Sequence, residues 1–288
     1  MKTIESQKRF RVFGKPSAAT TMSAAILVMI MTASPALSNA QSEKRTVFTQ
    51  NDFHWQGNLK AGQTLEVINR NGEIEASGAT NDAAQVDGSK SSSFGADKDL
   101  FIEVVEYPDG ATICAVYAKD AAPGRCHRGG VSSESREWHG HHAKLNFTVQ
   151  VPRGVLFNAL TTNGNVNCRD LNSVVKASTT NGNVEVSTSE WASASTTNGG
   201  VRVAMGNAQW TGELLLTSTN GSVNVKLPAA AAFTLNAATT NGGIHTDFPI
   251  TVEGSFNSKE LSGTVGGGGR ELKVATTNGG IELRKNGA

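Results

Sequence analysis

The sequence of 288 residues is short of several features that whole classes of protein depend on. Aromatic residues make up only 6% of it and charged residues 18%. No run of Lys or Arg follows residue 40, so the chain gives no electrostatic reason to bind nucleic acid. No apolar run reaches the length of a conventional membrane-spanning helix. An apolar content of 38% still separates the chain from disordered proteins.

The abundant residues are those of strands and turns. Gly, Thr and Asn contribute 31, 28 and 23 residues. Gly and Asn are poor helix formers that suit turns, whereas Thr suits strands. This composition argues against a helical bundle and against a coenzyme-binding α/β enzyme, and it predicts an all-β protein.

Residues 1–40 have the three parts of a signal peptide: a basic lead, a short apolar core at 22–33 and the small-residue sequence Ser38-Asn39-Ala40. An uncleaved short anchor is the alternative. Twelve apolar residues span about 18 Å as a helix, too little for a bilayer core of roughly 30 Å. We therefore predict an exported chain, periplasmic or at the cell surface. Residues 41–288 hold 21 basic and 24 acidic residues, a net charge of about −3.

The second half of the chain repeats one pattern. Thr-Thr-Asn-Gly, or a near copy, recurs at spacings of 17 to 37 residues, and an isolated copy stands upstream at Asn71-Gly72. The asparagines of the repeats, predicted to form turns, are Asn163, Asn181, Asn198, Asn220, Asn241 and Asn278. Apolar residues occupy alternate positions on both sides of each Asn-Gly, which predicts two strands that meet at a tight bend. Asn and Gly both tolerate the positive φ that such a bend requires.

Two folds fit this pattern. In a β-solenoid, or β-helix-like fold, each unit is one coil and Asn-Gly is a repeated corner. In a β-meander, each Asn-Gly closes a hairpin. We predict the solenoid, because stacked coils require the same residue type in every layer and hairpins do not. Eighteen residues would give a perimeter of about 60 Å, which suits a triangular coil.

The remaining chain is predicted to belong to the same domain. Residues 41–62 form an N-terminal segment, and 63–288 form a single solenoid domain. Residues 82–150 are an elaboration of hairpin and loop between a first coil and the repeats, with strands at 100–106, 111–118 and 144–151. The four glycines at 266–269 form a bend in the long last unit, since no phosphate-binding pattern follows them.

An ordered series of short motifs resembles a known family. It runs from Gln63-Thr-Leu-Glu-Val and Asn71-Gly72 through Ile113–Tyr117 and Phe147–Gly154 to the repeated Thr-Thr-Asn-Gly and Leu261–Gly269. The series is similar to the putative adhesin family of bacterial β-strand-repeat proteins, over about residues 60–285. The resemblance implies an exported β-solenoid-like protein without established catalytic residues. It also implies that some relatives accompany envelope-stress signalling.

Three cysteines are present. Cys114 and Cys126 lie twelve residues apart, on a strand and in the loop after it, and we predict a disulfide between them because export permits one. Cys168 takes a position held by Val in other repeats, so we expect it to be buried and unreactive.

The clustered histidines are the candidates for a copper or zinc site. His127, His139, His141 and His142 lie near Cys126. Their spacing matches no metal signature, so we predict neither a metal nor another cofactor.

The sequence offers little support for an enzymatic function. Residues 151–288 contain only Asp170 and Asp247 as aspartates, and carbohydrate chemistry needs paired carboxylates. His245 with Asp247 is the best local pair. We predict no enzyme.

One residue before each Asn is a Thr that should point outward, in a surface ladder of Thr162, Thr180, Thr197, Thr219, Thr240 and Thr277. A structural role is one interpretation, because stacked Asn and Thr side chains can satisfy each other. The functional interpretation is a polar face that contacts a repetitive partner. We therefore expect a non-enzymatic structural or interaction module at the bacterial envelope. Its unidentified partner would be envelope polysaccharide, or a membrane protein if the chain is an accessory or sensor of envelope stress. A carbohydrate-active β-helix enzyme comes third.

Overall fold

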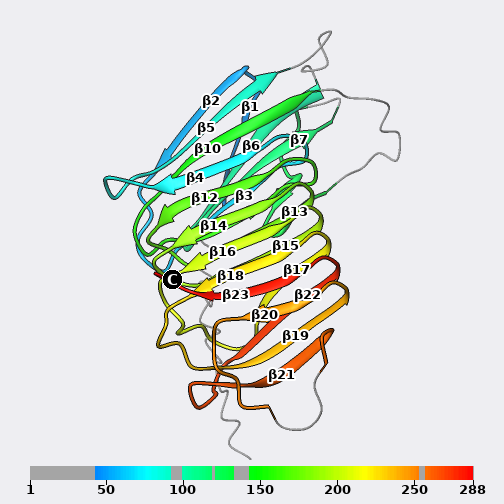
Figure 1. Cartoon of the computed structure of the whole chain (residues 1–288). Coiled ribbons are helices and arrows are strands. Elements are labelled where there is room, and N and C mark those ends of the chain that lie inside the picture. The colour runs from blue at the N-terminus through cyan, green and yellow to red at the C-terminus, as the bar shows by residue number, and fades with distance from the viewer. Residues whose placement is uncertain (1–42, 92–98, 119–120, 133–142, 253–256, 288) are drawn as a thin grey trace, which may run out of the picture. The chain divides into compact units, whose positions relative to one another are not determined.

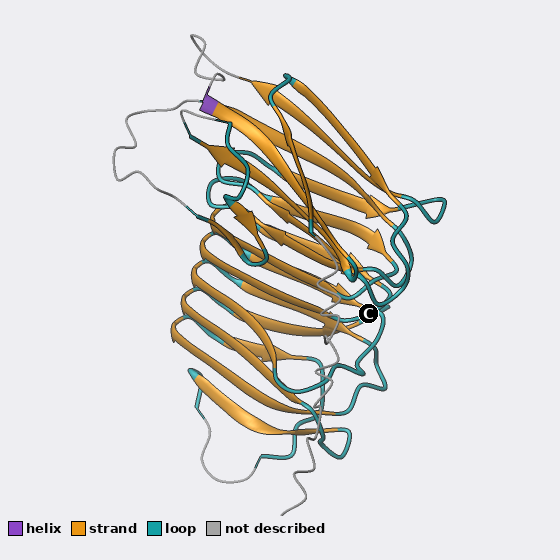
Figure 2. Ribbon diagram, turned by 180° about the vertical axis from the view of Figure 1, so that it is seen from behind, coloured by secondary structure: helices purple, strands orange, loops and turns teal. Residues whose placement is uncertain are grey.

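The computed structural model describes residues 43–91, 99–118, 121–132, 143–252 and 257–287. The chain divides into two compact units at Ala40 and Gln41, and the described residues all belong to the second. Strands and loops make up almost all of them (Figure 2). No helix in these ranges is both long enough and apolar enough to cross a membrane. The predicted signal peptide lies outside the described residues.

Two large sheets carry the fold, and a two-stranded sheet is added to them. In spatial order, sheet A consists of β1 (Lys44–Phe48), β6 (Leu100–Tyr107), β7 (Gly110–Tyr117), β3 (Thr64–Ile68), β11 (Leu156–Leu160), β13 (Val175–Asn181), β15 (Ala192–Asn198), β17 (Leu214–Asn220), β22 (Glu271–Asn278), β19 (Phe233–Asn241) and β21 (Glu260–Val265). Sheet B consists of β2 (Asp52–Gly57), β5 (Ala84–Ser91), β10 (Lys144–Val151), β4 (Ile74–Gly78), β12 (Val166–Leu171), β14 (Val184–Thr188), β16 (Val201–Met205), β18 (Val223–Leu227), β23 (Ile281–Lys285) and β20 (Ile244–Thr246). The small sheet pairs β8 (Cys126–His127) with β9 (Gly130–Val131).

Each repeat is one coil of a solenoid. The chain runs along a strand of sheet A, turns at Asn-Gly and returns along a strand of sheet B, and each strand pairs in parallel with the equivalent strand of the next coil. Residues at matching positions are therefore stacked, as with Ala177 on Ala194 and Val184 on Val201. The solenoid prediction is confirmed, and the hairpin alternative is wrong because the two strands at each Asn-Gly belong to different sheets. The coil has two strand-bearing sides, so its expected triangular section is also wrong.

The glycine of each turn is required by the closeness of the coils. A Cβ on Gly182 would lie 2.1 Å from the carbonyl oxygen of Gly164, and one on Gly199 would lie 2.0 Å from that of Gly182. These glycines have φ near +155°, where other residues are strained. The asparagines do not share this conformation, because Asp170 is the one non-glycine residue with positive φ in the described ranges. The positive φ of these turns is therefore adopted by Gly and not by Asn, although both residue types tolerate it.

The coils are not stacked in chain order. The last coil, β22–β23, lies between β17–β18 and β19–β20 (Figure 1). The chain makes this return through β21, an antiparallel strand on the outer edge of β19. The loop 266–269 then crosses from β21 to β22, and all four of its glycines have positive φ. Their bend was predicted, but the insertion it permits was not.

The elaboration extends the stack beyond its first coil. Strands β3 and β4 pair directly with β11 and β12 on one side, and with β7 and β10 on the other. Residues 82–150 therefore separate these coils in sequence but not in space. Strands β5 and β6 continue the sheets in antiparallel fashion, and β1 and β2, from the segment 41–62, form the edges.

A single core fills the space between the sheets, and aromatic residues occupy its two ends. The middle layers hold mostly Val, Ala and Leu. At one end Phe48, Phe53 and Phe147 pack edge to face, and at the other Trp210 and Phe248 pack against Phe233. Large rings suit the ends because no further coil is present there to fill the volume.

Candidate functional site

The Asn-Gly turns form an unbroken ladder of side-chain amides. Each of the six repeat asparagines donates a hydrogen bond of 2.7–2.8 Å from Nδ2 to Oδ1 of the Asn in the neighbouring coil, and Asn71 accepts the bond at one end. The ladder runs in the spatial order Asn71, Asn163, Asn181, Asn198, Asn220, Asn278 and Asn241. The upstream copy at Asn71 is thus part of the array, although 92 residues separate it from Asn163.

A buried hydroxyl column runs beside this ladder. The Thr or Ser two residues before each of the six repeat asparagines is 6% exposed and donates to the carbonyl oxygen of the turn glycine in the neighbouring coil. Examples are Thr196 to Gly182 and Ser218 to Gly199, both at 2.8 Å. A carbonyl that would otherwise lack a partner is satisfied in every layer, so these hydroxyls are structural.

The outward threonines differ from the buried ones. All six of Thr162, Thr180, Thr197, Thr219, Thr240 and Thr277 are exposed. Among the residues that the structure describes, their hydroxyls form no hydrogen bond with the protein, because the amides pair with each other instead. The expected mutual satisfaction of Asn and outward Thr is therefore wrong, and each hydroxyl keeps its capacity to donate and accept.

A second set of hydroxyls lies two residues before three of these threonines. Ser178, Ser195 and Thr217 share the outer face of sheet A and are paired in register. Rows on this surface are about 4.8 Å apart and columns about 6.7 Å apart. We call the six outward threonines with these three residues the hydroxyl face.

A disulfide fastens a loop over the other end of sheet A. Cys114 on β7 is bonded to Cys126, with their Cα atoms 5.7 Å apart, so the predicted disulfide is confirmed. The loop 121–132, called the clasp below, covers an apolar cluster that includes Phe101, Val105 and Val116. This cluster reaches Leu160, at the border of the hydroxyl face.

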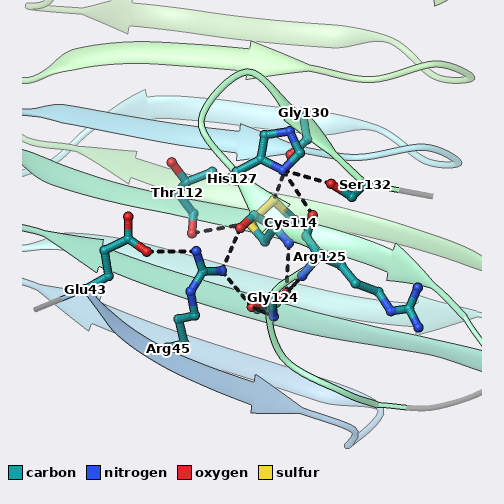
Figure 3. A network of polar contacts seen from close by, with 11 residues as sticks. Glu43, Arg45, Thr112, Cys114, Gly124, Arg125, His127, Gly130 and Ser132 are labelled. Atoms are coloured by element: carbon teal, nitrogen blue, oxygen red, sulfur yellow. Dashed lines mark hydrogen bonds and ion pairs between the residues drawn. A yellow bond between two sulfur atoms is a disulfide. The ribbon is translucent and has the colours of Figure 1, made fainter. Parts of the chain in front are cut away.

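Buried carboxylates hold the clasp in place. Glu103 is fully buried and accepts backbone N–H groups from Gly124 at 2.6 Å, Arg125 at 3.0 Å and Cys126 at 2.8 Å. Arg45 compensates its charge at 3.1 Å and also donates to the Cys126 carbonyl oxygen (Figure 3). Such a fully bonded buried carboxylate fixes the backbone around it.

Two further contacts anchor the far side of the clasp. Glu66 accepts the Gly129 N–H at 3.0 Å. Arg128 pairs with Asp109 and lies 4.3 Å from the centre of the Tyr107 ring. The Arg128 guanidinium lowers the pKa of Asp109 through this hydrogen bond.

Only one of the four clustered histidines lies among the described residues. His127 lies on the clasp, where its Nδ1 is 3.2 Å from the Arg125 carbonyl oxygen (Figure 3). His139, His141 and His142 lie outside the described residues. Within the described ranges no three His, Cys, Asp or Glu side chains are grouped as a metal site would require.

The residues considered for catalysis are not joined into a unit. Asp247 accepts the Lys285 N–H at 3.3 Å, and within the described part of the chain no hydrogen bond joins it to His245. Cys168 is buried in the core, and burial raises the pKa of its thiol to about 12. A thiol with this pKa is a poor nucleophile at neutral pH.

Fold and site together define a two-sided parallel β-solenoid with a regular polar face and a disulfide-fastened loop at one end. Residues 149–284 match the family model described as Toastrack DUF4097. The predicted family resemblance is confirmed.

Two solved structures are similar at low identity. One is described as a putative cell adhesion protein from Clostridium sporogenes ATCC 15579, with 12% identity, 82% of this chain and 100% of that chain covered and a TM-score of 0.43. The other is described as a putative adhesin from Bacteroides fragilis NCTC 9343, with 10% identity, 81% and 96% covered and a TM-score of 0.31. No curated protein matches the chain.

Several residues of these sites were not predicted from the sequence. Ser178, Ser195 and Thr217 could have been found, because each lies two residues before an outward threonine and residues two apart on a strand point to the same face of the sheet. Glu103 could not, since its partners lie more than twenty residues away along the chain.

Proposed function

We propose that the protein is an exported, non-enzymatic interaction module of adhesin type, and that its hydroxyl face contacts a repetitive polymer of the bacterial envelope. The observation that supports this most is the set of exposed threonine hydroxyls that form no hydrogen bond with any part of the chain that the structure describes. A scaffold needs only the Asn ladder and the buried hydroxyl column, so the outward threonines are available for another role.

The regular spacing of the hydroxyl face suits a partner that repeats. Each hydroxyl contributes a weak hydrogen bond in water, on the order of 1 kcal/mol. A partner that contacts several rows at once gains through effective concentration, because each later contact is intramolecular. A rigid array also loses little conformational entropy on binding.

The disulfide supports the proposed location. Disulfides persist in oxidising compartments such as the periplasm and the cell surface, and they are rare in reducing ones. Together with the signal peptide expected at residues 1–40, the bond between Cys114 and Cys126 favours export.

A pull-down against envelope fractions tests the proposal. The purified protein is immobilised and exposed to polysaccharide and membrane-protein pools from the same cells. We expect retention of polysaccharide, and at least tenfold less retention by the variant Thr180→Lys, Thr197→Lys, Thr219→Lys, because three cations would block adjacent rows.

The matched control carries the same added charge elsewhere. Gln209, Thr211 and Ala230 are exposed in loops between coils, and their replacement by Lys should leave retention unchanged. Equal loss in both triple variants, or no retention by the unmodified protein, would contradict the proposed role of the hydroxyl face.

A second candidate function is favoured by the clasp. Here the repeats are replaced by unique contacts, as recognition of one particular protein requires. The protein would then be an accessory or sensor of envelope stress that binds a membrane protein through residues 82–150. Capture of one discrete membrane protein, lost when the clasp is replaced by a short linker but kept in the Thr→Lys variant, would support this function instead.

A further inference from the structure

The outer face of sheet B carries a groove that the proposed function does not use. It has a volume of about 540 Å³ and crosses β12, β14, β16, β18 and β23. A second hollow of about 350 Å³ shares Glu185, Arg202 and Asn224 with it. The two therefore form one continuous depression along the stack, on the sheet opposite the hydroxyl face.

The floor of this groove is low because two small residues occupy its centre. Ser187 and Ala204 are paired in register on β14 and β16. The same register continues to Lys226 on β18 and Arg284 on β23. Small side chains thus stand in the middle of a column that ends in two cations.

A β-bulge shapes the other end. The pairing of β12 with β14 shifts between Cys168 and Leu171, and Asp170 has φ of +51°. The bulge makes the consecutive residues Arg169 and Asp170 both exposed and both part of the groove lining. Bulges re-aim side chains and are common next to functional sites.

The groove is lined by four cations, from Arg169, Arg202, Lys226 and Arg284, and by the three carboxylates of Asp170, Glu185 and Glu282. Within the described residues, Arg169 and Lys226 form no ion pair and no side-chain hydrogen bond, whereas the other two cations have carboxylate neighbours. Arg202 is 3.8 Å from Glu185, too far for a hydrogen bond, while Arg284 pairs with Glu282 at 2.9 Å. Lys226 and Arg284 stand side by side on paired strands, and the one carboxylate that Arg284 pairs with, Glu282, leaves the charge of Lys226 uncompensated.

We propose that this groove binds a linear polysaccharide that carries carboxylates. The unpaired cations at Arg169 and Lys226 lie three strand spacings apart, about 14 Å, so a ligand must present separated anionic groups along the stack. Arginine binds carboxylates well because its planar fork matches their two oxygens. The adjoining hollow is lined by amides of Asn167, Asn183 and Asn224, which suit the hydroxyls of sugar rings.

Calorimetric titration with polygalacturonate tests the ligand class. The purified protein should bind this polymer, and it should not bind the fully methyl-esterified form, which keeps the sugar backbone and loses the charges. Equal binding of the esterified polymer would overturn the need for carboxylates. Dextran sulfate and polyphosphate are the further arms, and binding of either as tight as that of polygalacturonate would show simple ion exchange, which also overturns the proposal.

Paired variants test the place of binding. Arg169→Gln with Lys226→Gln should weaken binding at least tenfold, and Ala204→Trp should do the same by filling the floor. Lys176→Gln with Lys273→Gln removes the same charge from exposed positions on sheet A, and it should change binding less than twofold. Similar losses in the two charge variants would overturn the site. An unchanged thermal midpoint establishes that each variant is folded.

This inference is separable from the proposed function. The Thr180→Lys, Thr197→Lys, Thr219→Lys variant should keep full affinity for polygalacturonate, because the substituted residues lie on the other sheet. The groove variants should likewise keep the retention that depends on the hydroxyl face. Loss of one activity without the other identifies which of the two proposals has failed.

Discussion

The repeat array and the N-terminal end of the molecule continue the same two sheets by different means. From β11 onward, each layer repeats one set of contacts: an amide pair, a buried hydroxyl on a carbonyl, and a glycine pressed against its neighbour. At the N-terminal end, single contacts hold the structure, above all the disulfide and Glu103 with Arg45. The array depends on geometry that any layer can reproduce, whereas the N-terminal end depends on residues that occur once.

The largest effect should come from a methyl group placed between two layers of the array. In Gly182→Ala, the new Cβ would lie 2.1 Å from the Gly164 carbonyl oxygen. We expect a loss of about 3–5 kcal/mol in the free energy of unfolding, from overpacking and backbone strain together. Urea denaturation measures it.

Gly212→Ala is the matched control for this variant. Gly212 also has positive φ, +74°, but a Cβ there would meet nothing within 4 Å. Its cost should be about 1 kcal/mol, from backbone strain alone. Equal costs at the two glycines would mean that close stacking does not restrict the turn.

At the N-terminal end, the next largest effect should follow from Glu103→Gln. The two carboxylate oxygens together accept three N–H groups and one guanidinium; the amide keeps the shape, but it loses the negative charge and replaces one of these oxygens by an NH2 donor. We expect a loss of about 3–4 kcal/mol, because Arg45 would lose its buried partner. Glu43→Gln removes the exposed partner of the same arginine and should cost less than about 1 kcal/mol; a similar cost would show that burial does not matter here.

Reduction of the disulfide should separate the two regions. Its loop of twelve residues contributes roughly 3 kcal/mol in the chain-entropy model. Dithiothreitol should therefore destabilise the clasp, and hydrogen exchange should rise in residues 121–132 while the Asn-Gly turns stay protected. Cys168→Ala should leave this response unchanged, and a uniform rise in exchange along the array would contradict independent regions.

Alkaline pH should act on the array more than on the N-terminal end. Burial raises the pKa of Cys168 from 9.0 to about 12, and that of Tyr117 from 10.0 to about 12. The unfolded chain loses these protons first, so stability is complete below pH 9 and falls as the pH rises towards 12. At pH 10.5 the burial of Cys168 should lower the free energy of unfolding by about 2 kcal/mol, and the burial of Tyr117 should lower it by less.

Urea titrations of Cys168→Ala and Tyr117→Phe measure these two contributions. The first variant should lose most of the pH dependence between 9 and 10.5, and the second should lose little. The opposite order would place the sensitive group at the N-terminal end.

The repeats predicted the fold of the array well because its contacts follow from position within the unit. The alternation around each Asn-Gly identified the inward residues, and Cys114 with Cys126 could be paired from their setting. The insertion of β22–β23 could not be predicted, because every coil presents the same edge to its neighbours and sequence order alone suggests a simple stack. The clasp contacts of Glu103 and the bulge at Asp170 were missed for a related reason. Each depends on one partner in space that no repeated pattern marks.

The position of β22–β23 has a consequence for how the molecule is made. A chain that emerges from its N-terminus onward produces the coil 233–246 before residues 271–285, yet that coil rests on the later one. The layer of β17 and β18 therefore acquires its final neighbours only when the last strands of the chain have been made. Loss of about twenty C-terminal residues would consequently remove an interior layer, not a terminal one, and a translation product shortened in this way would expose two matching edges to aggregation.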